Sequence, residues 1–92
     1  MYDTEKDIRI KRLKYRANHR GIKEMDIILG GFANARIETL SDAELDAFET
    51  LMGEQDRDLV VWFTGEVVFP HEHLKPIFEM IRQFLLSVNN DA

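Results

Sequence analysis

The sequence contains no cysteine, only two prolines and only five glycines among its 92 residues. Without cysteine, the chain can form neither disulfides nor thiolate metal sites, and it offers no thiol nucleophile. No apolar run approaches the ~18 residues that a membrane-spanning helix needs. The opening stretch MYDTEKD is acidic and polar, unlike a secretory signal or an arginine-rich transit peptide. We therefore expect a cytoplasmic protein without a membrane span.

What is present is typical of a globular protein, with 45% hydrophobic and 32% charged residues. The charge is unevenly distributed along the chain. Residues 1–24 hold eight Lys and Arg against four Asp and Glu, whereas residues 25–92 hold four against thirteen, which gives the net charge of −5. A basic first segment on an acidic body can steer charged partners, but it does not specify a fold.

Apolar residues recur at helical spacing along the whole chain. We predict one all-α domain over residues 1–92, a compact bundle of about five helices. The first helix is expected from Thr4 to about Ala17, and the second is expected to begin near Gly21. Their inward stripes comprise Ile10, Leu13 and Ala17 in the first helix and Ile22, Met25, Leu29 and Phe32 in the second. Gly30 and Gly31 should weaken the last turn of the second helix, because each glycine costs about 1 kcal/mol relative to alanine in a helix interior.

The third helix has the clearest start signal. In LSDAEL, Ser41 and Glu44 can form a capping box, in which each side chain bonds the other residue's backbone N–H. Gly53 supplies the stop. The expected inward face consists of Leu45, Phe48, Leu51 and Met52.

The segment DRDLVVWFTG fits a short buried helix that Gly65 ends, with Asp56 or Asp58 as its N-cap. VVWF alone would also fit a strand, but no partner strand is evident. After the loop EVVFPHEH, a final helix carries an apolar repeat from Leu74 to Val88. Pro76 fits within the first turn of that helix, where its missing N–H removes no bond.

No catalytic constellation emerges from these residues. His71 and His73 flank Glu72, but a zinc site needs at least three ligands, so we interpret both histidines as solvated loop residues and expect no metal site. His19 has no serine, threonine or cysteine neighbour to activate. The lone Trp62 lies in an apolar run and is interpreted as a core residue, with a half-exposed binding residue as the alternative.

The segment HRGIKEMD, residues 19–26, carries more charge than a turn between helices needs. It can be a structural junction in which Gly21 relieves backbone strain and Arg20 pairs with Glu24, although such an exposed pair contributes only about 0.3–0.5 kcal/mol. It can equally be a binding patch in which Arg20 donates bidentately and Glu24 and a solvent-facing Asp26 accept from a partner across the open backbone at Gly21. The residues alone leave both interpretations open.

Three blocks in order resemble one known family. RGIKE is similar to the RGxxE signature of the SdhE-type FAD assembly factors for succinate dehydrogenase. LSDAELDAFETLM resembles that family's LSxxE helix, and DRDLVVWFTG resembles its D-x-D-L-x-x-W segment, which the proline of VVFP follows. The resemblance covers roughly Arg12 to Pro70, and the last helix matches in character only.

The resemblance implies a five-helix bundle that is not itself an enzyme. Members of the SdhE-type family bind the flavoprotein subunit of succinate dehydrogenase, and in some bacteria that of fumarate reductase. They promote covalent attachment of FAD to a histidine of that client. FAD then belongs to the client, and we expect no cofactor to be bound stably by this chain. The residues that the resemblance assigns to partner binding are Arg20, Gly21, Glu24, Asp26, Arg12 and Trp62.

Two other functions compete with this hypothesis. The basic first helix and the helix–turn–helix that follows it could bind nucleic acid, but the overall acidity and the apolar stripe of the second helix argue against it. A small helical interaction module, such as an antitoxin-like partner of a toxin, is the other alternative. We expect no nucleic-acid partner and a monomer when the protein is free.

Overall fold

Helices make up all the regular secondary structure of the part of the chain that is described. The computed structural model describes residues 4–90, with the side chains of residues 4–88, and this part contains no strand. Five helical segments follow one another, which confirms the predicted all-α bundle. They are α1 (Glu5–Asn18), a continuous segment containing α2 (Lys23–Met25) and α3 (Gly31–Arg36), then α4 (Asp42–Met52), α5 (Asp56–Phe63) and α6 (Lys75–Asn90).

The first helix begins and packs as its sequence predicts. Thr4 is its N-cap and forms a capping box with Asp7. Ile10, Leu13 and Ala17 are its buried residues, so the predicted inward stripe is confirmed. Because these residues lie on one face of α1, the opposite face is left to solvent.

The second helical segment continues past Gly30 and Gly31. Between α2 and α3 it passes through a π-helical turn, Asp26–Gly30, and it ends only after a 3₁₀ turn, Ile37–Thr39. A Cβ atom on Gly30 would lie 2.6 Å from Oδ1 of Asn18 and 3.3 Å from the carbonyl oxygen of Ala17. The helix therefore does not end at these glycines, as the sequence suggested, whereas their cost to its stability stays a prediction; Gly30 serves the close approach of this segment to α1.

The start of α4 agrees with the sequence and the start of α5 does not. Ser41 and Glu44 form the predicted capping box, and the helix ends at Met52 before Gly53. The N-cap of α5 is Gln55, which makes no side-chain capping bond. The prediction that Asp56 or Asp58 caps α5 was wrong, because both already belong to the helix. The predicted helix, rather than a strand, is confirmed for the VVWF run.

The last helix extends past the core. Pro76 is its second residue, as predicted, and Ile77, Phe78 and Ile81 are buried. Further along, Leu86 and Val88 are exposed, so the apolar repeat continues where little of the bundle remains to cover it. None of the helices within residues 4–90 is long and apolar enough to cross a lipid bilayer.

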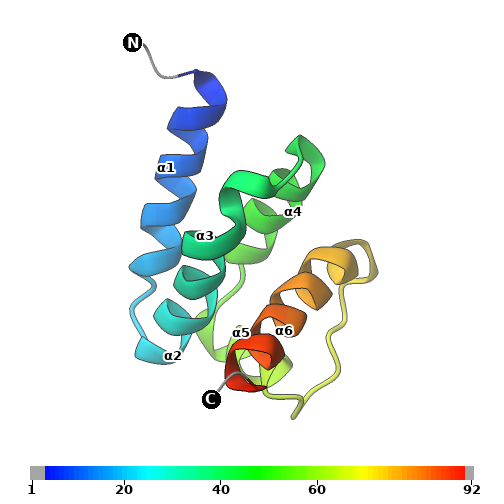
Figure 1. Cartoon of the computed structure of the whole chain (residues 1–92). Coiled ribbons are helices and arrows are strands. Elements are labelled where there is room, and N and C mark those ends of the chain that lie inside the picture. The colour runs from blue at the N-terminus through cyan, green and yellow to red at the C-terminus, as the bar shows by residue number, and fades with distance from the viewer. Residues whose placement is uncertain (1–3, 91–92) are drawn as a thin grey trace.

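The bundle places α3 between α1 and α6, with α4 behind it and α5 at the lower end (Figure 1). Aromatic rings link these elements in the core. Phe32 of α3 lies 5.7 Å from Phe48 of α4, and Phe69 of the loop stacks on Phe78 of α6 at 4.1 Å between ring centroids. No polar or charged residue of the described part is fully buried. The charged residues therefore lie on or near the surface. Those that already have a partner within the protein are not available to bind another molecule.

Candidate functional site

The turn between α1 and α2 needs glycine. Gly21 has a φ of +110°, a backbone conformation that residues with a side chain rarely adopt. The carboxylate of Asp26 accepts a hydrogen bond from the backbone N–H of Arg20, which closes the turn. The prediction that Asp26 faces solvent was wrong, since this side chain is partly buried and stabilises the turn from inside.

Arg20 is engaged inside the protein. Its Nε donates to Oδ1 of Asp56 at 2.8 Å, its Nη1 donates to the carbonyl oxygen of Met52, and its Nη2 donates to the carbonyl oxygen of Glu54 at 2.9 Å. Nη2 also lies 2.8 Å from Oδ1 of Asp56, and only 13% of the Arg20 side chain is exposed. We call these contacts the Arg20 clasp.

The clasp corrects both interpretations of Arg20. The ion pair of Arg20 is with Asp56, 36 residues away, and not with Glu24. All three nitrogens of the guanidinium already have acceptors, so the prediction of a free bidentate donor was also wrong. The physical reason is the end of α4, where carbonyls without helical partners attract a cation.

Glu24 remains free for a partner. It lies in the first turn of α2 and is exposed, and none of the described residues hydrogen-bonds or pairs with its side chain. Gly21, next to it in the turn, is also exposed. The site therefore presents the carboxylate of Glu24 and the exposed backbone at Gly21 to solvent. The guanidinium of Arg20, in contrast, is held inside the protein by the clasp.

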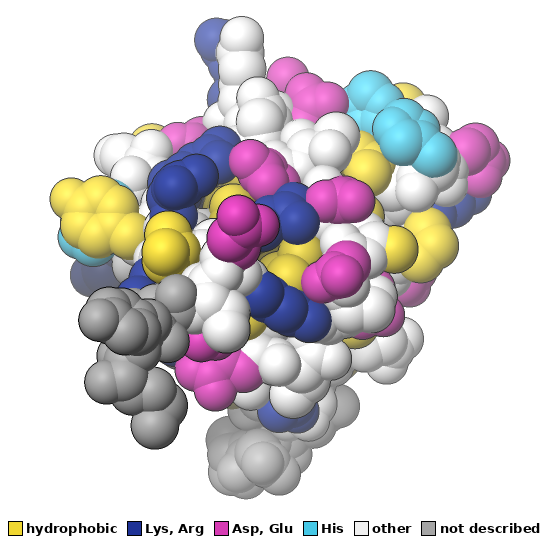
Figure 2. Space-filling view, turned by 90° about the horizontal axis from the view of Figure 1, so that it is seen from above, with side chains coloured by type: hydrophobic (Ala, Val, Ile, Leu, Met, Phe, Trp, Pro, Cys, Tyr) yellow, Lys and Arg dark blue, Asp and Glu magenta, His cyan; other side chains and the backbone are white. Residues whose placement is uncertain are grey.

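The basic face of α1 is largely neutralised by acidic residues. Arg9 lies 2.6 Å from Asp46 and 2.9 Å from Glu49, and the hydrogen bonds to Asp46 and then Glu49 raise the pKa of Arg9 above its ordinary value. Three more cations pair in the same way: Lys6 with Asp42, Lys14 with Glu38 and Arg16 with Glu49. Seen from above, basic and acidic side chains lie next to one another across the middle of the molecule (Figure 2).

Arg12 differs from these cations. It is exposed, and no carboxylate of the described residues lies within ion-pair distance of it. Among the six residues that the resemblance assigns to partner binding, the exposed ones are Arg12, Gly21 and Glu24.

Trp62 belongs to the core, as its position in the apolar run predicts, so the alternative of a half-exposed binding residue was wrong. It is 9% exposed and meets Phe69 edge-on at 5.1 Å between ring centroids. His71 also packs edge-on against Trp62, and its Nε2 lies 2.9 Å from Oε1 of Glu54. His71 is therefore a half-buried loop residue with a protein partner and not a fully solvated one, whereas His73 is exposed as expected. Within residues 4–90, no three His, Cys, Asp or Glu side chains are grouped to hold a metal ion.

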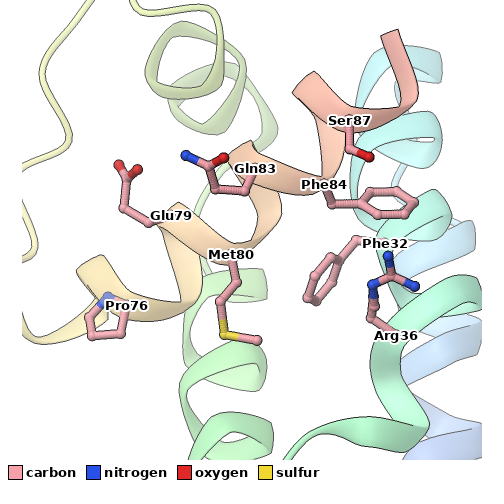
Figure 3. Close-up of a pocket in the computed structure, with 8 residues that line it drawn as sticks. All are labelled: Phe32, Arg36, Pro76, Glu79, Met80, Gln83, Phe84 and Ser87. Atoms are coloured by element: carbon pink, nitrogen blue, oxygen red, sulfur yellow. The ribbon is translucent and has the colours of Figure 1, made fainter. Parts of the chain in front are cut away.

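A groove of about 420 Å³ lies between α3 and α6 (Figure 3). Phe32, Met80 and Phe84 give it an apolar floor, and the guanidinium of Arg36 lies over the Phe84 ring at 5.3 Å. No nucleophile paired with a base lines this groove. The groove therefore offers an apolar surface beside one arginine.

Sequence reasoning missed Asp56 as a member of the site. The sequence indicates Asp56 only as a candidate cap of α5, and nothing local connects it to Arg20, 36 residues earlier. The one available signal was the resemblance itself, because the D-x-D-L block and the RGxxE block belong to the same family pattern.

Comparisons with known proteins agree with that pattern. A family model described as "Flavinator of succinate dehydrogenase" matches residues 11–85. An "FAD assembly factor SdhE" of Acetobacter pasteurianus is 41% identical over 69 residues, which cover 75% of this chain and 63% of that protein. A mitochondrial "Succinate dehydrogenase assembly factor 2" of Schizosaccharomyces japonicus is 35% identical over 88 residues, which cover 95% of this chain and 61% of that protein.

This chain therefore spans a little over three fifths of the length of these two curated relatives. The family model, in contrast, covers most of the chain, from the middle of α1 into α6. The protein belongs to the family of flavinators of succinate dehydrogenase.

Proposed function

We propose that this protein is an assembly factor that binds the flavoprotein subunit of succinate dehydrogenase and promotes covalent attachment of FAD to it. The observation that carries the proposal is the match of residues 11–85 to the flavinator family, together with relatives named for FAD assembly. Our proposal extends to the flavoprotein of fumarate reductase as a second client. We further propose that the protein acts in the cytoplasm, as a monomer when free, and has no nucleic-acid partner.

The protein acts by positioning its client and is not an enzyme. Attachment joins a histidine nitrogen of the client to the flavin ring methyl carbon. One methyl C–H bond and the imidazole N–H bond break, their protons pass to the ring or to solvent, and the electron pair of the C–H bond stays on the flavin, which is reduced. The flavin is thus its own oxidant, and what the client needs is alignment of the two reacting atoms. FAD is held by the client, and this chain binds no cofactor stably.

In our proposal, some residues contact the client and others hold the turn in position. Glu24 and Arg12 are exposed charges without partners among the described residues, and they contact the client across Gly21. Arg20 is a positioning residue, because its clasp holds the turn that presents Glu24. Asp26 supports the same turn through the backbone of Arg20.

The test is co-expression of the client flavoprotein subunit with wild-type protein or with Glu24→Gln, followed by in-gel fluorescence of covalent flavin. We expect Glu24→Gln to lower flavin attachment about tenfold, since hydrogen bonds to a charged group are worth about 1.5–3 kcal/mol. Glu66→Gln is the matched control, because Glu66 is also an exposed glutamate without a partner among the described residues. Unchanged attachment with wild-type protein present or absent would refute the proposed function.

A further inference from the structure

The groove between α3 and α6 has an apolar floor that the bundle leaves partly uncovered. Phe32 closes its base and is 1% exposed, whereas Met80 and Phe84 of α6 are half-buried. The rings of Phe32 and Phe84 meet edge-on at 5.8 Å between centroids, which fixes the aromatic part of the floor. The volume of about 420 Å³ falls within the range of sites for small molecules.

The groove is elongated and carries its arginine at one end. Figure 3 shows Arg36 beside the Phe32 and Phe84 side chains, with Met80 further along and Pro76 at the opposite end. Phe84 and Pro76 lie eight residues apart on α6, which corresponds to about 12 Å along the helix axis. A hydrocarbon chain of medium length can therefore lie along the floor, and the flexible thioether of Met80 can adapt to it.

Two charged residues line the groove, and Glu79 is already paired. Its Oε1 lies 3.2 Å from Nη1 of Arg82. Arg36 is exposed, and no acceptor within residues 4–88 hydrogen-bonds or pairs with its guanidinium. The contact of Arg36 with the Phe84 ring, at 5.3 Å from the centroid, uses the charge of the guanidinium and leaves its N–H donors available. The groove therefore combines one uncompensated positive charge with an apolar floor.

We propose that the groove between α3 and α6 binds a small amphipathic monocarboxylate, a medium-chain fatty acid in free form. Its carboxylate lies on Arg36 and its hydrocarbon chain lies along Phe84 and Met80. Charge complementarity selects an anion, because a guanidinium binds a carboxylate bidentately. The lining selects a ligand with one charged end, because a second carboxylate would lie over apolar side chains without a partner.

The proposed ligand site is independent of the proposed function. In Figure 1, α6 lies on the far side of α3 from α1, so the groove does not continue the surface around Glu24. None of the residues that line the groove belongs to the turn between α1 and α2. Variants of the groove therefore test the ligand site alone.

The experiment titrates the isotope-labelled full chain with octanoate, below the concentration at which octanoate forms micelles, and follows backbone amide shifts by NMR. We expect saturable binding with a Kd of about 1 mM or lower and the largest shifts at Phe32, Arg36, Met80 and Phe84. Decanoate should lower Kd about fourfold and hexanoate should raise it about fourfold, because an open groove buries only part of each added CH₂ group.

Arg36→Gln tests the charged end of the site. It should raise the Kd of octanoate about tenfold and leave the Kd of octanol within about twofold of wild type, since octanol has the same chain without the charge. Arg57→Gln is the matched control, because Arg57 is also an exposed arginine whose side chain has no partner among the described residues. Met80→Gln should raise the Kd of both probes about threefold, because it places a polar amide in the apolar floor.

Three results would overturn the site. Shifts that increase linearly with octanoate up to about 10 mM would show that the groove does not bind this class of ligand. Equal losses with Arg36→Gln and Arg57→Gln would show that octanoate responds only to the net charge of the protein. Retention on phosphatidylglycerol vesicles without octanoate binding would assign the apolar surface to a membrane instead.

Discussion

At the residue scale, two adjacent glycines have different roles. Gly30 faces α1, where its missing side chain lets the second helical segment approach Asn18 and Ala17. The Asn18 amide cannot move aside freely, because its Nδ2 donates to the carbonyl oxygen of Lys14 at 2.8 Å and to Oδ1 of Asn34 at 3.0 Å. Gly31 has no such neighbour, since a Cβ atom there would lie 3.8 Å from the Phe84 ring.

We therefore expect opposite effects from the same substitution at the two positions. Gly30→Ala should lower the free energy of unfolding by about 1–3 kcal/mol, because the added methyl group overpacks the contact with α1. Gly31→Ala should be neutral or stabilise by up to about 1 kcal/mol, because alanine is the better helix former and fits the space. Urea unfolding of both variants measures this difference. Equal stabilities would contradict the assigned role of Gly30.

At the element scale, the Arg20 clasp joins segments that are far apart in the sequence. One guanidinium bonds the end of α4 through the carbonyl oxygens of Met52 and Glu54, and it bonds the start of α5 through Asp56. Since Arg20 follows α1 directly, this one side chain fixes three helix ends relative to one another. In our proposal, this is how the arginine of the RGxxE motif supports the binding surface without touching the partner.

Substitutions in the clasp should destabilise the fold. We expect Arg20→Lys and Asp56→Asn each to lower the free energy of unfolding by about 1–3 kcal/mol, because each leaves partly buried groups without their partners. The double variant should lose less than the two single losses combined, since both substitutions remove the same interaction. Chemical denaturation of the four proteins in this cycle gives the coupling energy. Single variants with wild-type stability would show that the clasp contributes nothing to the fold.

Glu24→Gln is the contrasting variant at this scale. Its side chain is exposed and has no partner within the described residues, so its removal should leave stability within about 0.5 kcal/mol of wild type. Stability thus separates Arg20, which positions the turn, from Glu24, which contacts the client in our proposal.

At the scale of the whole molecule, the basic first helix is largely neutralised by the acidic remainder of the chain. The ion pairs from Lys6, Arg9, Lys14 and Arg16 all reach carboxylates beyond residue 24, mostly on α4. Affinity for nucleic acid depends on cations that release counterions from phosphates. Cations already held by carboxylates are poorly placed to do so.

We therefore expect no salt-dependent retention of a random-sequence DNA duplex at ~150 mM salt, where phosphate-binding proteins still bind. An electrophoretic mobility assay at several salt concentrations measures this. The double substitution Asp46→Asn and Glu49→Gln frees Arg9 and should increase retention at low salt, which makes it the positive control. Retention of the wild-type protein that falls steeply with salt would favour the nucleic-acid alternative.

Much of the fold follows from local patterns. The capping box at Ser41, the buried stripe of α1 and Pro76 in the first turn of α6 all depend on residues within a few positions of one another. Helix starts, apolar faces and proline positions are properties of neighbouring residues, so the sequence was sufficient for the all-α bundle and its five segments. The family resemblance likewise depends on three short blocks of sequence, RGIKE, LSDAELDAFETLM and DRDLVVWFTG.

The parts that could not be read from the sequence involve contacts between distant residues. Nothing in RGIKE indicates that Arg20 bonds Asp56, that Asp26 turns inward, or that Gly30 meets Asn18. Each of these depends on where helices meet, and an exposed charge and a paired one have the same local sequence. The periodicity of apolar residues was thus sufficient to identify the helical segments. Only the packing of the helices determines which charged residues are paired within the fold and which, like Glu24, remain available to a partner.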